Sequence, residues 1–146
     1  MFVRSYVLLL LFMLVHAHGV VAAPALQRLN HVELLAKLTA GESVEALVEE
    51  SEAGSTQALD RIWYESEDGC LQTGIYETGA NRYTINDPYP HDELMQFIEG
   101  GVTLTPTEGD AITVVAGDTV MLPKGWTGVW DSEGYRKVYV IYHCPE

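Results

Sequence analysis

Cysteine and histidine, the side chains most often used for redox chemistry and metal binding, are scarce in this sequence. The 146 residues contain two cysteines, Cys70 and Cys144, and five histidines. The cysteines form no Cys-x-x-Cys pair, so thiol redox chemistry has no support. In an oxidising compartment they would form a disulfide across a long loop, which stabilises a fold by ~4–5 kcal/mol. The alternative is two unpaired thiols buried in strands.

The charge balance excludes one class of function. There are 8 Lys and Arg against 21 Asp and Glu, which gives a formal net charge of −13. A nucleic-acid-binding surface needs clustered basic side chains, and here they are scattered, so we expect no nucleic-acid partner. Hydrophobic residues make up 47% of the chain, which indicates a globular domain rather than a disordered one.

The first 23 residues have the pattern of a secretory signal peptide. One positive charge, Arg4, precedes an apolar run over residues 7–15, and small residues follow it. Cleavage after Ala22 or Ala23 predicts a secreted or periplasmic domain that makes no membrane contact. An uncleaved anchor is the alternative, although the strongly apolar run is shorter than the ~20 residues of a membrane-spanning helix.

Residues 24–60 are expected to form an N-terminal helical strap and a linker. Asn30 followed three residues later by Glu33 resembles a capping box at the start of one helix. Ser43 can cap a second short helix that continues to Val48. Both helices are too short to form a hydrophobic core of their own, so we expect them to pack on a sheet.

Residues 61–146 change to short runs of alternating hydrophobicity separated by Gly, Pro and Asn-Asp turns. Such a pattern is typical of an all-β barrel or sandwich. Turn signals at Gly79-Ala80-Asn81, Gly100-Gly101 and Glu133-Gly134 separate three pairs of neighbouring strands. The expected strands are 61–66, 70–77, 81–86, 93–99, 101–105, 110–115, 118–122, 126–130 and 135–143.

Several of these residues resemble the two motifs of the cupin superfamily. Glu93 followed by Gly100 resembles the end of the first motif, and Gly117 with Pro123 and Gly125 resembles the start of the second. This resemblance implies an all-β cupin fold, that is, a double-stranded β-helix or jelly-roll barrel, here preceded by the short N-terminal helices.

Two further stretches narrow the resemblance to one branch of that superfamily. Residues 122–130 and 136–140 look like small single-domain cupins related to ureidoglycine aminohydrolase and to the ethanolamine-utilisation cupin. The resemblance covers about residues 61–143. It implies less about function than about fold, because cupins host many unrelated activities.

Most of the metal ligands that the cupin resemblance implies are missing. Metal-dependent cupins place a His-x-His pair just before the motif glutamate, and residues 86–89 contain no histidine. The histidine of the second motif would stand at Gly128. A catalytic metal site needs about three protein ligands, and only Glu93 remains, so we expect no cofactor. The alternative is a weakly bound divalent metal held by Glu93, His91 and His143.

Strand periodicity predicts which side chains line the barrel. If Glu93 points inward, Met95 and Phe97 do so too, and an inward Gly128 would leave open space beside inward tryptophans. The expected ligand-binding residues are Glu93, Met95, Phe97, Tyr76, Tyr83, Trp126 and Trp130. An aromatic cavity with one carboxylate suits a small amphipathic or cationic ligand. The alternative is an interior filled by these same side chains, with Glu93 hydrogen-bonded to tyrosines.

Two hypotheses of function follow. The first is an exported, non-catalytic cupin-fold domain that binds a small molecule in this pocket. The second is a hydrolase resembling ureidoglycine aminohydrolase, which would act on a C–N bond of a small nitrogenous metabolite. There Glu93 would serve as catalytic acid or base, or as a weak metal ligand. Because cupins often dimerise, a homodimer through Trp63 and Tyr64 is a further expected partnership.

Overall fold

The computed structural model describes residues 28 and 45–144, and its regular structure there consists of seven β-strands. Over those residues, no helix has the length and apolar character needed to cross a membrane. The expected all-β class is confirmed, whereas the signal peptide and the helix expected after Asn30 lie outside the described residues. The strands are β1 Glu45–Ser51, β2 Gly54–Glu65, β3 Leu71–Ile85, β4 Asp92–Pro106, β5 Ile112–Val115, β6 Thr119–Leu122 and β7 Gly128–Tyr142.

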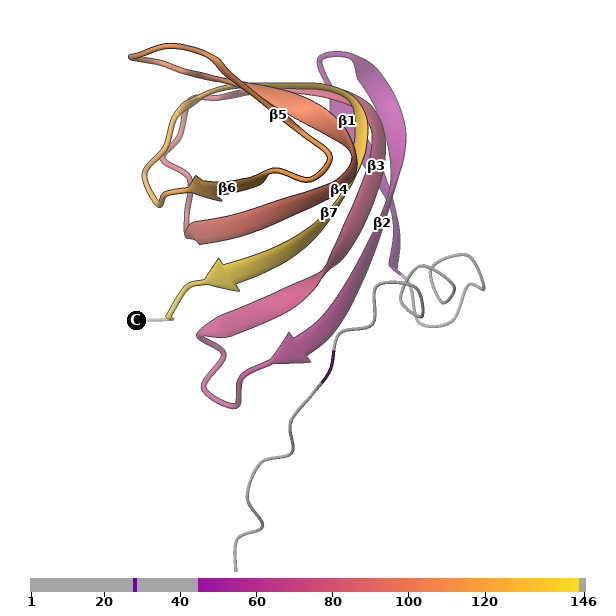
Figure 1. The fold of residues 1–146 in the computed structure, drawn as a ribbon, viewed down its shortest axis with the longest axis vertical. Coiled ribbons are helices and arrows are strands. Elements are labelled where there is room, and N and C mark those ends of the chain that lie inside the picture. The colour runs from indigo at the N-terminus through magenta and orange to yellow at the C-terminus, as the bar shows by residue number, and fades with distance from the viewer. Residues whose placement is uncertain (1–27, 29–44, 145–146) are drawn as a thin grey trace, which may run out of the picture.

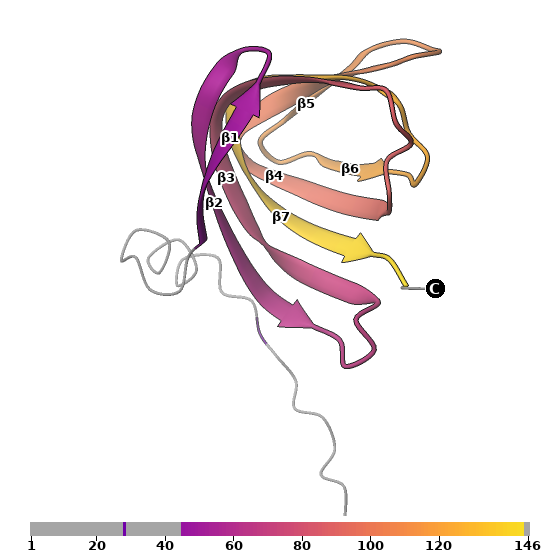
Figure 2. The same ribbon diagram turned by 180° about the vertical axis from the view of Figure 1, so that it is seen from behind.

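The seven strands form one antiparallel sheet in the order β1-β2-β3-β7-β4-β5, with β6 paired to β4. The last long strand, β7, therefore lies between β3 and β4. Figures 1 and 2 show the long strands curving together, so that the sheet has a concave inner face. The bent sheet buries several residues of each of β3, β4 and β7, whereas Ala58 is the one buried residue of β2.

The hydrophobic core fills part of this concave face. Along β4, buried and exposed residues alternate from Glu93 to Phe97, as a half-buried strand requires. Burying each large apolar side chain contributes about 1.5–3 kcal/mol. The core cluster consists of Met95, Phe97, Val102, Leu104, Val114, Leu122, Trp130, Tyr135 and Tyr139.

The three turns predicted at Gly79-Ala80-Asn81, Gly100-Gly101 and Glu133-Gly134 are wrong. The two short strands expected on either side of each turn form one long strand, namely β3, β4 or β7. Gly79 in β3 and Gly101 in β4 both pair with Gly134 in β7, so the three glycines lie in one row across the sheet. Register shifts interrupt the β4–β7 pairing between Phe97 and Glu99 and again after Gly101. Glycines and bulges bend strands without ending them, which explains the curvature.

The second expected helix is also wrong over the described residues, because Glu45–Ser51 forms β1. This strand pairs along its whole length with β2, so residues 45–60 belong to the same sheet as the rest and are not a linker. The hairpin turn is closed by the Ser51 hydroxyl, which donates to the Gly54 carbonyl over 2.9 Å. Seven consecutive pairings outweigh the weak helix propensity of this short segment.

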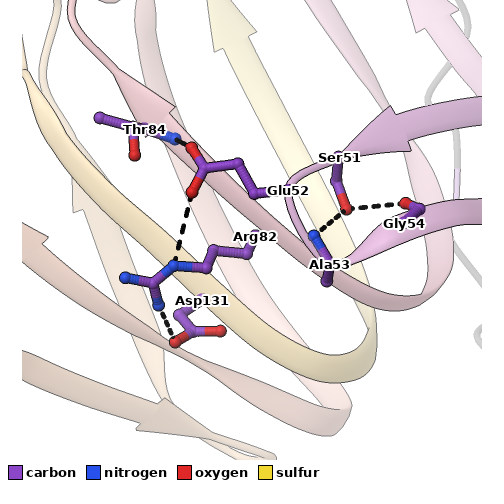
Figure 3. A network of polar contacts seen from close by, with 7 residues as sticks. All are labelled: Ser51, Glu52, Ala53, Gly54, Arg82, Thr84 and Asp131. Atoms are coloured by element: carbon purple, nitrogen blue, oxygen red, sulfur yellow. Dashed lines mark hydrogen bonds and ion pairs between the residues drawn. The ribbon is translucent and has the colours of Figure 1, made fainter.

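Polar contacts attach the β1–β2 turn to the sheet, as Figure 3 shows. The Thr84 backbone N–H donates to Glu52 over 2.8 Å. Hydrogen bonding from the Thr84 side chain, together with this backbone bond, lowers the pKa of the Glu52 carboxyl. The Arg82 guanidinium lies 3.6 Å from the same carboxylate and also pairs with Asp131 of β7. The turn is therefore attached to β3 directly, and to β7 through Arg82.

A disulfide joins Cys70 to Cys144 across 74 residues, with their Cα atoms 4.2 Å apart. The two cysteines flank the paired ends of β3 and β7, where Leu71 lies opposite Tyr142. The His143 backbone N–H also donates to the Cys70 carbonyl over 2.8 Å. The sequence allowed either a disulfide or two unpaired thiols, and the structure contains the disulfide.

Candidate functional site

A cavity of about 300 Å³ opens on the concave face of the sheet. Its walls come from β1, β2, β3, β4 and β7 and from the segment between β3 and β4. Most of the wall is aromatic or aliphatic, with a few charged groups among the rings. The lining residues are Glu49, Asp60, Gln72, Tyr76, Tyr83, Ile85, Tyr89, His91, Glu93, Trp130, Tyr135, Lys137, Tyr139 and Ile141.

A buried ion pair lies in this cavity wall. The Lys137 ammonium donates to Glu93 Oε1 over 2.7 Å, and the two residues are only 7% and 2% exposed. The Tyr89 hydroxyl donates to the other oxygen, Glu93 Oε2, over 2.6 Å. Burial raises the pKa of Tyr89, and the Glu93 charge raises it further, so the phenol stays protonated and remains a donor. Both oxygens of Glu93 are thus hydrogen-bonded by neighbouring side chains.

Three aromatic rings surround the Lys137 ammonium. Its Nζ lies 5.2 Å from the centroid of the Trp130 ring, 5.5 Å from that of Tyr76 and 5.7 Å from that of Tyr135. Ring faces attract a cation, and the attraction is stronger where water is excluded. The cavity is therefore built to hold a positive charge at this point.

Two more carboxylates face the cavity, each bonded to a tyrosine. The Tyr83 hydroxyl donates to Glu49 Oε2 over 2.8 Å, and the Tyr139 hydroxyl donates to Asp60 Oδ1 over 2.9 Å. Burial raises the pKa of both tyrosines, and hydrogen bonding to the carboxylate adds to that rise.

The charges of the lining sum to a negative value. Among the residues that the structure describes, the cavity wall holds three carboxylates and one ammonium, that of Lys137. Burial lowers the pKa of His91 below its ordinary value of 6.5, so this imidazole is neutral at pH 7. The field inside the cavity therefore favours a cation over an anion.

Four of the seven expected ligand-binding residues line the cavity, namely Glu93, Tyr76, Tyr83 and Trp130. Met95 and Phe97 face inward as the periodicity requires, but they are packed in the core at 0% and 1% exposure. Trp126 packs against the same core and does not line the cavity. Cavity and filled core thus occur together, at different places on the concave face.

The open space expected at Gly128 is absent. A Cβ at this position would collide with the Thr105 carbonyl and would lie 2.9 Å from the Pro106 Cα and 2.8 Å from the Trp126 ring. This glycine allows close approach of two strands, because Gly128 pairs with Pro106 of β4. A side chain would not fit at the position where many cupins have a metal-binding histidine.

Sequence reasoning missed Lys137, and it also missed Glu49 and Asp60 of the cavity wall. Lys137 stands in β7 between Tyr135 and Tyr139, all three of which are buried. The period-two rule, applied to β7 as it was applied to β4, would have placed this lysine on the inner face. Tyr89 was missed because the expected turn gave its side chain no direction.

The side chains at this site do not fit a divalent metal. Glu93 carries an ammonium and a phenol, both hydrogen-bond donors, where a metal site would need lone pairs. His91 lines the cavity, and its ring centroid lies 6.4 Å from that of His143. Over residues 28 and 45–144, no three His, Cys, Asp or Glu residues come together as a metal-binding group. The positive charge beside Glu93 is instead supplied by Lys137.

A curved antiparallel sheet with two short strands beside β4 and a pocket on its inner face defines a small cupin. The profile of the EutQ-like cupin domain matches residues 65–139, and the chain belongs to this family. No curated protein matches the chain.

Solved structures show the same fold. A DUF861-family protein of unknown function from Pseudomonas syringae pv. tomato is 26% identical, with a TM-score of 0.59 over 67% of this chain and 43% of that one. The chain therefore spans less than half the length of that relative. A putative ethanolamine utilization protein Q from Salmonella typhimurium is 17% identical, with a TM-score of 0.53 over 70% and 96% of the two chains. EutQ from Clostridium difficile is 18% identical, with a TM-score of 0.51 over 65% and 75%. The last two likenesses concern the fold alone.

Proposed function

We propose that this protein is an exported cupin domain that binds a small organic cation or amine in its aromatic cavity, without a tightly held metal. The observation that carries this proposal is the lining of the cavity. In the described part of the chain, aromatic rings, three carboxylates and the Lys137 ammonium enclose about 300 Å³. Cavities of this size hold small ligands, and rings together with carboxylates attract cations.

Glu49 is the group best placed to recognise the ligand. Its carboxylate accepts a hydrogen bond from Tyr83, and a carboxylate has further lone pairs that can accept from a ligand ammonium. Glu93 was the expected recognition group, but its charge is balanced by Lys137. We therefore assign recognition of a cation to Glu49.

Export is supported by the disulfide and by the N-terminal sequence pattern. A disulfide persists in oxidising compartments such as the periplasm or the extracellular space. Expression of the full chain in a bacterial host, followed by sequencing of the mature N-terminus, tests this part. A mature chain beginning at residue 23 or 24 supports export, and an intact N-terminus on cytoplasmic protein contradicts it.

Binding is tested by thermal-shift screening of chelator-treated protein against amines, ureides and sugars. Ethanolamine belongs in this panel because it is small and cationic and because a structural relative is named for ethanolamine utilization. We expect amines to raise the melting temperature and neutral sugars to leave it unchanged. A flat response to the whole panel would contradict the proposal.

A matched pair of variants locates the binding site. Glu49→Gln removes a carboxylate from the cavity wall and should weaken amine binding by about tenfold, the loss of one charge-assisted hydrogen bond. Glu50→Gln is the control, because that neighbouring side chain is exposed and bonds to Ser55 of the hairpin. Equal losses in the two variants would place binding elsewhere.

The Glu93 site favours one alternative function, a hydrolase acting on a C–N bond. A buried carboxylate beside an ammonium can take a proton from water and return it to a leaving amine. Ammonia release from ureides by the wild type, lost in Glu93→Gln, would establish this activity. If ligands bind and are recovered unchanged, the binding function stands and the hydrolase is excluded.

A further inference from the structure

The chain contains only three lysines, and one of them is placed unlike an ordinary surface lysine. They are Lys37, Lys124 and Lys137. Of the two that the structure describes, Lys124 is exposed in the turn between β6 and β7. Lys137 is 7% exposed and lines the cavity. Its side chain therefore borders the cavity and is shielded from bulk solvent.

A group that can move protons touches this amine. Glu93 Oε1 lies 2.7 Å from Lys137 Nζ, and Tyr89 holds the other carboxylate oxygen at 2.6 Å. Condensation of an amine with a carbonyl compound needs a base that removes a proton from the ammonium. It then needs an acid that protonates the departing hydroxyl. One carboxyl in hydrogen-bond contact can do both in succession.

The surroundings also suit the product of such a condensation. Trp130, Tyr76 and Tyr135 place their rings 5.2, 5.5 and 5.7 Å from the Lys137 nitrogen. A protonated imine carries the same single positive charge on that nitrogen as the ammonium did. The rings and the Glu93 carboxylate therefore stabilise the product as they stabilise the free side chain.

We propose that Lys137 is a covalent site that forms an imine with a small aldehyde or ketone entering the cavity. Glu93 takes a proton from the ammonium, and the free amine adds to the carbonyl carbon to give a carbinolamine. The protonated Glu93 then gives its proton to the carbinolamine hydroxyl, which leaves as water while the C=N bond forms. One ammonium and one carbonyl compound become one iminium and one water, so atoms and charge balance and no oxidant or reductant is needed.

The cavity also selects the class of carbonyl compound. Its volume of about 300 Å³ admits only a small molecule. Glu49 faces the same space and repels a carboxylate on the ligand. We therefore expect uncharged or amine-bearing aldehydes and ketones to react, and 2-oxo acids to react poorly.

The experiment is reductive trapping on the full chain, with propanal as the probe and sodium cyanoborohydride as the trap. Digestion and mass spectrometry then locate the propyl group. Burial alone would make Lys137 react more slowly than the exposed Lys124. The proposal instead expects Lys137 to be labelled roughly tenfold faster than Lys124, because the imine forms beside a positioned proton donor. Equal labelling, or faster labelling of Lys124, overturns it.

Variants and a second probe sharpen the result. Lys137→Arg keeps the charge and should lose the rapid label, whereas Lys124→Arg, an exposed control, should keep it. Glu93→Gln should slow labelling of Lys137 by about tenfold or more. Pyruvate in place of propanal should label Lys137 much more slowly. The mapping in wild-type protein decides the question even if a buried variant fails to fold. Amine binding without rapid labelling would overturn the imine and leave the proposed binding function intact.

Discussion

At the scale of single residues, the site depends on a buried pair of opposite charges. Lys137 and Glu93 are hydrogen-bonded over 2.7 Å with almost no solvent contact. Removing water from two charges is costly, and their mutual attraction offsets that cost only while both are present.

The first prediction concerns this pair. Lys137→Met leaves Glu93 buried without a cation and should destabilise the fold by about 3–5 kcal/mol, and Glu93→Gln alone should have a cost of similar size. The double variant should lose less stability than the sum of the two single losses, since it leaves no unpaired charge. Denaturant unfolding of all four proteins measures the coupling. Strictly additive losses would mean that the two side chains do not interact.

The second prediction concerns acid. Burial lowers the pKa of His91, so between the ordinary value of 6.5 and the lower folded value the unfolded chain binds a proton that the folded chain does not. The free energy of unfolding is thus independent of His91 at a pH well above 6.5, and it falls as the pH drops below 6.5. His91→Gln should flatten the pH dependence of unfolding over this range. An unchanged slope in the variant would refute the assignment.

Much of the site could be predicted from residue types and from the period-two alternation of side chains along a strand. The pairing of its charged groups could not. The alternation placed Glu93, Met95 and Phe97 on one face, and the structure buries all three. Which of them meets the cavity depends on how far the core extends, and a periodic pattern carries no such information. The partners of Glu93 come from residues 4 and 44 positions away, so only the folded sheet brings them together.

At the scale of elements, glycines bend the long strands where the sequence indicated turns. Local signals for a turn and for a bent strand are the same residues, and the difference lies in the neighbouring strands. Gly79 and Gly101 each face Gly134 across the sheet, so the bend runs through three strands. The strand at Glu45–Ser51 was likewise decided by its pairing with β2 and not by its own composition.

The third prediction tests one such bend. Gly100 has a φ of 64°, and a Cβ there would collide with the backbone of Gly134 and Tyr135 in β7. Gly69 has a similar φ of 71° in a turn, with nothing within 4 Å of its Cβ position. Gly100→Ala should therefore cost about 3–5 kcal/mol against about 1–2 kcal/mol for Gly69→Ala, measured by chemical unfolding. Equal costs would show that β7 does not crowd this position.

At the scale of the whole molecule, the disulfide closes most of the described domain into one loop. It joins the start of β3 to the end of β7, the two strands that carry most of the cavity wall. The sequence left open whether the two cysteines pair, because distance in the fold, and not spacing along the chain, decides that.

The fourth prediction is that this bond contributes strongly to stability. The variant Cys70→Ser with Cys144→Ser should lose about 4 kcal/mol, because the unfolded chain regains the freedom that a closed loop of this length removes. Reduction of wild-type protein should have an effect of the same size, and reduction of the variant should have none. If reduced and oxidised wild type unfold alike, the bond constrains little.

We propose above all that the pocket binds its ligand through aromatic rings and carboxylates, with Lys137 supplying the charge that a metal supplies in other cupins. Calorimetric titration of chelator-treated protein with the best amine from the panel tests it most directly. We predict one site per chain, with the same affinity before and after addition of zinc. Binding that appears only when a metal is restored would contradict the account.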